Sequence, residues 1–337
     1  MTPMDIGWKL CRTESKFFMQ NPLLQVENLK LYYPVRGGGW WKPRQFVRAV
    51  DDVSFTINPG ETVGLVGESG CGKSSLGRTI VRLENATGGR ILFNNRNLTE
   101  LNGGELRASR KHFQMIFQDP YGSLNPRLTV RAALNEVLAL HFIGGKNERE
   151  KRAAELLQLV GLEADLLSRY PHQFSGGQRQ RIGIARALAA EPELIVADEP
   201  VSALDVSVQA QIINLLQDIQ RKIGTAFLFI AHDLAVVQHI SQRILVMYLG
   251  RIVESGPAAE VCGNPKHPYT KALLSAVPKI DRIANEHRIV LSGDVPSPLN
   301  PPNGCAFHPR CPFAMDECKQ HSPVLSGGEH QCACHLL

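Results

Sequence analysis

Continuous apolar runs without polar alternation mark the segments that we expect to form buried strands. Leu194–Ala197 and Ala226–Ala231 are runs of this kind. Such runs are typical of strands buried on both faces of a mostly parallel sheet. Other short strand-like runs lie at Leu23–Leu29, Phe46–Ile57 and Glu61–Val66, and a further strand pair is expected at Ile91–Phe93 and Gln114–Phe117.

The spacing of apolar residues becomes helical between these strands. We predict a helix over Lys73–Arg82, a mainly helical block over Val130–Leu188 and a helix at Ile182–Ala189. Strands separated by helices predict an α/β fold. The glycine-rich segment Gly37–Pro43 reads as a hairpin tip that exposes Trp40 and Trp41.

Composition divides the chain into three parts. Its 337 residues are 43% hydrophobic and 20% charged, which is typical of a globular protein. Past about residue 285, Pro296, Pro298, Pro301 and Pro302 mark an extended linker into a cysteine-rich end. We therefore expect a tail over 1–20, one folded domain over 21–285 and an extension over 286–337.

Charge and hydropathy indicate where in the cell the protein is expected to work but do not identify its partner. The formal net charge of +5 suits an anionic partner without choosing one. No run approaches the roughly 18 apolar residues that span a bilayer, and Met1–Gln20 lacks the apolar centre of a signal peptide. We expect a cytosolic protein that reaches a membrane only through partners, with Met19 as an alternative start.

A phosphate-binding loop follows the strand at Glu61–Val66. The segment from Gly67 to Ser74 matches G-x-x-x-x-G-K-[ST] and opens the predicted helix. Its backbone N–H groups are expected to cradle phosphates, Lys73 to reach the β- and γ-phosphates, and Ser74 to bind Mg²⁺. The expected ATP-binding residues here are Gly67, Glu68, Ser69, Gly70, Cys71, Gly72, Lys73, Ser74 and Ser75.

Two adjacent acids end another buried strand. Asp198 and Glu199 follow Leu194–Ala197, and paired carboxylates at such a place need a cation or a shared proton. We expect Asp198 to hold Mg²⁺ and Glu199 to orient or deprotonate the attacking water.

A second anion site lies between these motifs. Ser175, Gly176, Gly177 and Gln178 stand at a predicted helix start, where a hydroxyl and free N–H groups can meet phosphate. Two phosphate-binding features separated by a helical block do not fold easily onto one nucleotide. The sequence therefore predicts a composite site between two subunits.

Over roughly residues 22–285 this set of motifs closely resembles the ATP-binding cassette (ABC) family. The resemblance implies a P-loop fold with a RecA-like core, an antiparallel β subdomain and a helical subdomain. It implies that Gln118 binds Mg²⁺ with Ser74 and Asp198, and that His232 senses the γ-phosphate as a catalytic residue beside Glu199 and Gln118. It further implies that Asp205 lies in the D-loop and that Tyr33, or its neighbour Tyr32, stacks on adenine.

Three further segments resemble the oligopeptide and dipeptide importer branch, in particular its "F" subunit: 119–127, 267–274 and 296–302. This resemblance implies ATP and Mg²⁺ as cofactors and a peripheral place on the cytoplasmic face of the inner membrane. The implied partners are two permeases, a second and non-identical ATPase, and indirectly an extracytoplasmic solute-binding protein. Nickel or glutathione transport remains an alternative, as does a non-transport ATPase acting on nucleic acid, although no nucleic acid is expected.

Five of the eight cysteines lie within the last 33 residues, and four of them are the proposed ligands: Cys305, Cys311, Cys318 and Cys334. In a reducing compartment such clustering favours metal or cluster binding over disulfides. Their spacing resembles a C-terminal motif of this branch that can hold a [4Fe–4S] cluster. Zinc and unligated reduced cysteines remain alternatives, and Cys332 is an alternative to Cys334.

Overall fold

A seven-stranded sheet forms the centre of the protein. The computed structural model describes residues 21–35, 45–141, 144–277 and 289–337. The strand order is β11-β10-β9-β3-β8-β7-β6, in which β6 to β9 and β3 form the parallel part. The parallel strands are β3 (Thr62–Val66), β6 (Phe113–Ile116), β7 (Leu194–Asp198), β8 (Ala226–Ala231) and β9 (Arg243–Tyr248).

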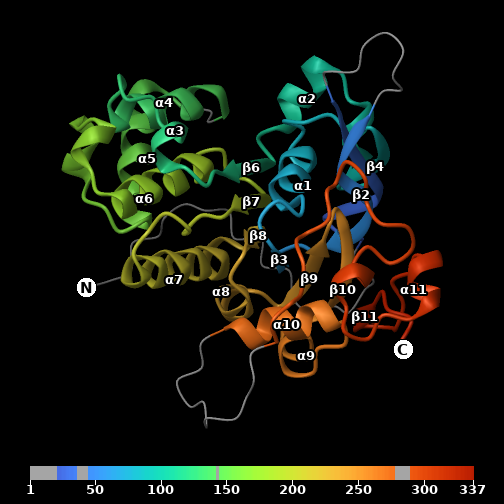
Figure 1. Ribbon diagram of the computed structural model, residues 1–337. Helices are drawn as coiled ribbons and strands as arrows, with labels where there is room; N and C mark the ends of the chain where they lie inside the picture. The colour runs from blue at the N-terminus through green and yellow to red at the C-terminus, as the bar shows by residue number, and fades with distance from the viewer. Residues whose placement is uncertain (1–20, 36–44, 142–143, 278–288) are drawn as a thin grey trace.

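The predicted burial of the unalternated runs is confirmed. Every residue of β3, β7 and β8 is buried, because helices cover both faces of this sheet (Figure 1). The covering helices are α1 (Lys73–Ile80), α7 (Val206–Ile223), α8 (Leu234–Ile240), α9 (Ala258–Gly263) and α10 (Pro268–Ala276).

A four-stranded antiparallel sheet lies beside α1, in the order β2-β1-β4-β5. Its strands are β1 (Leu24–Pro34), β2 (Phe46–Ile57), β4 (Gly88–Phe93) and β5 (Arg96–Asn97), followed by α2 (Gly103–Ser109). The expectation that 91–93 and 114–117 form a strand pair is wrong, because β4 joins this sheet and β6 joins the central one. Local sequence shows two strands but not which sheet each one enters.

Strands β1 and β2 pair with each other on the two sides of the expected hairpin tip. Val35 N–H donates to the Gln45 carbonyl at 2.9 Å, and β1 pairs with β2 along its length. The tip with Trp40 and Trp41, like the tail over 1–20 with Met19, lies outside the described residues.

The chain between β6 and β7 forms a helical lobe. It contains α3 (Pro120–Ser123), α4 (Val130–His141), α5 (Lys146–Leu159) and α6 (Gly176–Leu188). The last helix begins at the Ser-Gly-Gly segment and not at Ile182 as predicted, because Ser175 caps it and the following glycines are already helical.

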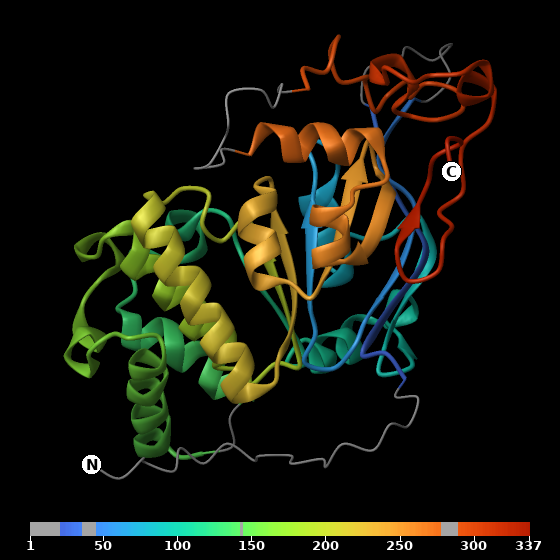
Figure 2. The ribbon, with the colours of Figure 1, turned by 90° about the horizontal axis from the view of Figure 1, so that it is seen from below.

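The extension returns to the central body. Strand β10 (Arg251–Pro257) pairs antiparallel with β9, and β11 (Gln331–Cys332) then pairs with β10 as the sheet edge. The extension also carries α11 (Asp316–Gln320). Figures 1 and 2 place the helical lobe and this extension on opposite sides of the sheet.

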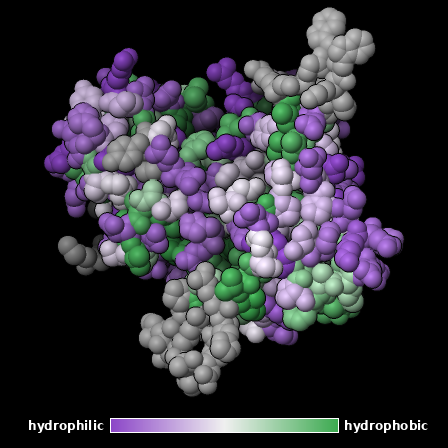
Figure 3. Space-filling model, viewed as in Figure 1, coloured by the Kyte–Doolittle hydropathy of each residue, from purple (hydrophilic) through white to green (hydrophobic). Residues whose placement is uncertain are grey.

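The visible surface is mixed in character. Figure 3 shows polar residues spread over this face and interrupted by small apolar patches. Among the described helices, none has the length and apolar character needed to cross a membrane.

Candidate functional site

The glycine-rich loop between β3 and α1 has the backbone shape of a phosphate cradle. Gly72 caps α1 in the left-handed region at φ 107°. A Cβ atom there would lie 2.0 Å from the Ala49 carbonyl oxygen, so only glycine fits. Lys73 is buried, and its Nζ donates to the carbonyl oxygens of Gly67 at 2.7 Å and Glu68 at 3.0 Å.

The carboxylate pair meets this loop at the end of β7. Ser74 Oγ donates to Asp198 Oδ1 at 2.7 Å. Asp198 is 1% exposed, and burial raises the pKa of its carboxyl group. A buried carboxylate next to a hydroxyl at a parallel strand end fits a hard cation such as Mg²⁺.

Glu199 contacts two further predicted site residues, Gln118 and His232. Gln118 Nε2 donates to Glu199 Oε2 at 3.0 Å, and His232 Nδ1 lies 3.5 Å from the same oxygen. Glu199 adopts φ 44°, a left-handed conformation that is uncommon for a side chain of this size. Such strain at a strand end is typical of functional positions.

Strand polarity explains why these residues meet. Strands β3, β6, β7 and β8 run parallel, so their carboxyl ends lie at one edge of the sheet. The phosphate loop follows β3, and Gln118 follows β6. Asp198 ends β7 with Glu199 directly after it, and His232 follows β8.

A pocket of about 350 Å³ opens at this edge. Tyr33 lines it, whereas the Tyr32 hydroxyl donates to the Asp51 carboxylate elsewhere. Sequence reasoning missed Val47, Ala49 and Pro298, which also line the pocket. The segment at 296–302 was visible in the sequence, but nothing there showed that it reaches this site. The full lining is Tyr33, Val47, Ala49, Ser69, Gly70, Gly72, Lys73, Ser74, Ser75, Gln118, Glu199 and Pro298.

The Ser-Gly-Gly segment lies apart from the pocket. Ser175 Oγ accepts from Gln178 N–H at 3.3 Å, and the Gln178 side chain accepts from Ser175 N–H at 3.0 Å. This capping box presents a helix N-terminus in the helical lobe, and none of its residues lines the pocket. Asp205 similarly precedes α7, where Val206 is 81% exposed.

Comparison of the sequence with known proteins identifies the family. A model described as ABC transporter matches residues 50–202, and one described as the oligopeptide/dipeptide transporter C-terminal region matches 253–318. The chain is 51% identical to the oligopeptide transport ATP-binding protein AppF of Bacillus subtilis, over 94% of this chain and 98% of that protein. It is 50% identical to the dipeptide transport ATP-binding protein DppF of Haemophilus influenzae, over 90% and 93%.

The chain belongs to the ABC transporter ATPase family, in the oligopeptide/dipeptide branch.

Solved structures agree with the assignment to the ABC family and with its fold. A dimeric post-hydrolysis ATP-binding cassette bound to ADP and Pi matches with a TM-score of 0.62 and 30% identity, over 70% of this chain and 98% of that one. A cassette of the cbiONQ transporter of Clostridium perfringens matches with a TM-score of 0.63 and 26% identity, over 73% and 92%. The chain is an ATP hydrolase with the ABC cassette fold.

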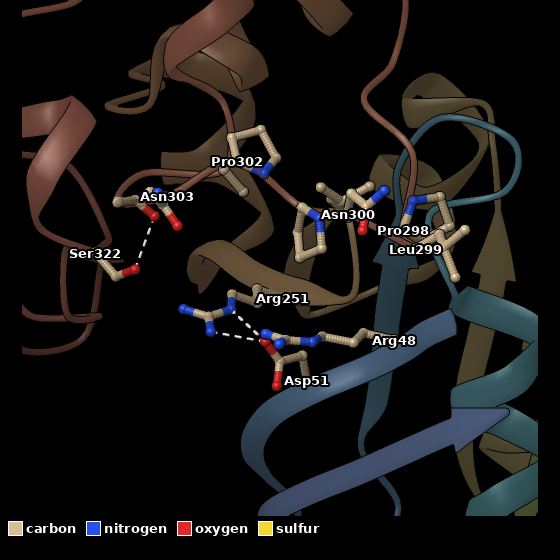
Figure 4. Close-up of a pocket in the computed structure, with 13 residues that line it drawn as sticks. Arg48, Asp51, Arg251, Pro298, Leu299, Asn300, Pro302, Asn303 and Ser322 are labelled. Carbon is tan, nitrogen blue, oxygen red and sulfur yellow. Dashed lines mark hydrogen bonds and ion pairs between the residues drawn. The ribbon is translucent and has the colours of Figure 1, made fainter. Parts of the chain in front are cut away.

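A second pocket of this ABC ATPase, of about 370 Å³, lies between the antiparallel sheet and the linker over 298–304. Figure 4 shows the Arg251 guanidinium turned to the Asp51 carboxylate, at 2.7 and 3.0 Å. Arg48 N–H donates to the Pro298 carbonyl at 3.0 Å. The linker is therefore anchored to the strand that carries Val47 and Ala49 of the ATP pocket.

Two of the four tail cysteines are directly joined, because the Cys305 N–H donates to the Cys318 carbonyl at 2.8 Å. Burial raises the pKa of the Cys305 and Cys311 thiols, and the nearby Cys318 and Cys334 raise both further. Cys332 contributes to neither shift; it lies on β11. Among the described residues, however, no three His, Cys, Asp or Glu side chains are placed to hold a metal ion. A cluster therefore requires the thiols to draw closer together.

Proposed function

We propose that this ATPase powers the import of dipeptides or oligopeptides. The support comes from relatives whose names give oligopeptide or dipeptide transport, together with the matching C-terminal region. The observation that carries the catalytic assignment is the meeting of Gln118, Glu199 and His232 at the edge of the sheet.

We assign a role to each site residue at the carboxyl ends of the parallel strands. Residues Gly67 to Ser75 bind the phosphates, with Lys73 as the cation that meets the β- and γ-phosphates. Ser74, Asp198 and Gln118 would hold Mg²⁺, which neutralises phosphate charge when bound. Glu199 orients or deprotonates the attacking water, and His232 contacts the γ-phosphate. Tyr33 stacks on adenine, since it lines the pocket and Tyr32 does not.

The active unit is a pair of cassettes. The capping box at Ser175–Gln178 is remote from the chain's own pocket, so we assign it to the nucleotide of a partner cassette. Asp205 and the exposed Val206 would lie in the same contact. The partner is a second, non-identical ATPase, and this chain alone would hydrolyse ATP slowly.

The pair works on two permeases at the cytoplasmic face of the membrane. A solute-binding protein delivers the peptide from the other side. The segment over 121–127 follows Gln118, so it is suited to pass changes at the γ-phosphate to a permease. The division at residues 285 and 286 stays part of this proposal, although β11 of the extension joins the sheet of the cassette.

The tail would bind a [4Fe–4S] cluster through Cys305, Cys311, Cys318 and Cys334. The hydrogen bond of 2.8 Å from the Cys305 N–H to the Cys318 carbonyl supports a shared site, and four thiolates suit iron–sulfur or zinc. A cluster there would brace the tail, since metal binding contributes directly to the folding of such segments.

Reconstitution tests the proposed transport. The chain is co-expressed with the genes of its neighbouring permeases, second ATPase and solute-binding protein, and the purified complex is placed in vesicles. ATP-dependent uptake of a labelled dipeptide or oligopeptide is expected, and uptake of nickel or glutathione but no peptide would contradict the peptide assignment. ATP hydrolysis stimulated by nucleic acid instead of by the loaded binding protein would contradict the transport role.

A further inference from the structure

Glu68 of the phosphate loop is held by two residues from the C-terminal part of the chain. Its backbone N–H donates to the Tyr269 hydroxyl oxygen at 2.7 Å. Its carboxylate accepts two hydrogen bonds from the Arg310 guanidinium, at 2.7 and 3.1 Å. Two parallel charge-assisted bonds fix both distance and orientation, which a single bond does not.

Both holding side chains are themselves fixed. Tyr269 is fully buried and Arg310 is 8% exposed. The buried Phe307 ring packs against the rings of Tyr248 and Tyr269, with centroids 5.2 and 5.5 Å away, and the two tyrosine rings also contact each other at 4.8 Å. Tyr269 stands on α10, whose first turn is capped by the His267 ring. Tyr269 cannot leave Glu68 without opening this core, and Arg310 is held beside Glu68 with little exposure to solvent.

Glu68 also contacts Lys73, the phosphate-binding lysine of the loop. The Glu68 carbonyl oxygen accepts from Lys73 Nζ at 3.0 Å. The N–H, the carboxylate and the carbonyl of Glu68 thus face three different partners. A shift of Glu68 would displace the carbonyl that holds Lys73 and the turn that precedes the phosphate cradle.

We propose that Tyr269 and Arg310 are positioning residues that hold the phosphate loop in its ATP-binding shape, so that the C-terminal region sets the affinity of the site for nucleotide. We call this pair the P-loop clamp. The inference rests on the proposed role of residues 67–75 in binding phosphate. Neither clamp residue lines the ATP pocket, so both act through Glu68.

The test measures kcat and KM for ATP in the assembled transporter. Arg310→Gln and Glu68→Gln each remove the charged pair, and Tyr269→Phe removes only the hydroxyl oxygen. We expect KM for ATP to rise about tenfold for each, with kcat little changed, because a loosened loop loses binding that is uniform along the reaction. The double variant Glu68→Gln/Arg310→Gln should be no weaker than either single one, and Arg310→Lys should lie between.

Lys319→Gln is the matched control. Lys319 lies in the same extension and forms an exposed ion pair with Asp316 at 2.8 Å, away from the loop. Its replacement should leave KM unchanged. If Tm falls in Arg310→Gln and Tyr269→Phe while KM stays at the wild-type value, the pair is merely structural and the clamp is refuted. Additive effects in the double variant would refute it as well.

One further variant separates this inference from the site assignment. Lys73→Ala should abolish ATP binding, and retained binding would overturn the role of the loop itself. Loss of binding in Lys73→Ala together with wild-type KM in all three clamp variants would overturn the clamp alone. Should Arg310→Gln fail to fold, Tyr269→Phe keeps the ring and its packing, so its KM still decides.

Discussion

The Gln118 side-chain amide donates a hydrogen bond of 3.0 Å to the Glu199 carboxylate, joining the ends of two neighbouring parallel strands. Gln118 lies in the chain just before the helical lobe, and Glu199 is the proposed water-positioning group. The contact therefore links the proposed water-positioning carboxylate directly to the segment proposed to face a permease. Loss or gain of this bond on hydrolysis would move that segment.

Glu199→Gln should keep ATP binding and nearly stop hydrolysis. The amide retains the shape and the contact with Gln118 but cannot take a proton, so turnover should fall about 100-fold or more. Single-turnover hydrolysis in the assembled transporter measures this, and the ATP-loaded cassette pair should persist on a sizing column. Glu193→Gln, at the exposed opposite end of β7, is the control and should hydrolyse normally. Near-normal turnover in Glu199→Gln would remove the assignment.

Ser74→Ala should raise the Mg²⁺ concentration needed for hydrolysis. The variant removes the hydroxyl that lies 2.7 Å from Asp198, and loss of one oxygen ligand with its hydrogen bond should cost about tenfold in the apparent Mg²⁺ affinity. A Mg²⁺ titration of the ATPase rate at saturating ATP measures the shift. Ser168→Ala, on a turn of the helical lobe, is the matched control. An unchanged titration in Ser74→Ala would argue against this cation site.

The isolated chain should gain activity from its partner cassette. Hydrolysis should be slow for this chain alone and rise steeply when the second cassette is added, since each pocket lacks a Ser-Gly-Gly segment of its own. Ser175→Arg in this chain should then impair the partner's pocket while its own pocket still binds ATP. Photolabelling by an ATP analogue, read separately in each chain, distinguishes the two. A fully active complex holding two copies of this chain and no other ATPase would contradict the non-identical pair.

Acid should weaken the fold through His267. Burial lowers the pKa of this imidazole to about 4, and its ring nitrogen accepts the Tyr269 N–H, which requires the neutral form. The unfolded chain binds the proton near pH 6.5, so stability is full above that pH and falls as pH drops toward 4. The loss should be about 2 kcal/mol at pH 5. Urea unfolding of the wild type and of His267→Asn at pH 7 and pH 5 isolates this contribution, since asparagine can cap without titrating. An equal loss in both proteins would contradict it.

Cys311→Ser should remove the cluster from protein made anaerobically. The expected signs are loss of brown colour and iron, and faster hydrogen exchange beyond residue 300. Because Arg310 directly precedes Cys311, ATP binding should survive but weaken, by no more than in Arg310→Gln. Cys262→Ser, a free cysteine outside the tail, serves as control. Absence of iron in the wild type would reject the cluster, and stoichiometric zinc would retain the thiolate site with another metal.

Local sequence determined most of the catalytic edge. The glycine-rich loop, the acidic strand end and the buried apolar runs are signals within ten residues, and parallel strands carry their carboxyl ends to one edge. Spacing therefore predicted that Lys73, Asp198 and Glu199 would approach one another. The capping residues at Ser175–Gln178 were visible in the sequence, although the helix was predicted to begin only at Ile182.

Only the tertiary structure decided what reaches that edge from far along the chain. It separated β4 from β6 into two sheets, turned Tyr32 to Asp51 while Tyr33 lined the pocket, and brought Pro298 beside the phosphate loop. It also placed Arg310 on Glu68, 242 residues away in sequence. Such contacts follow from how β10, α10 and the tail pack as complete units, and no local propensity or spacing encodes that packing.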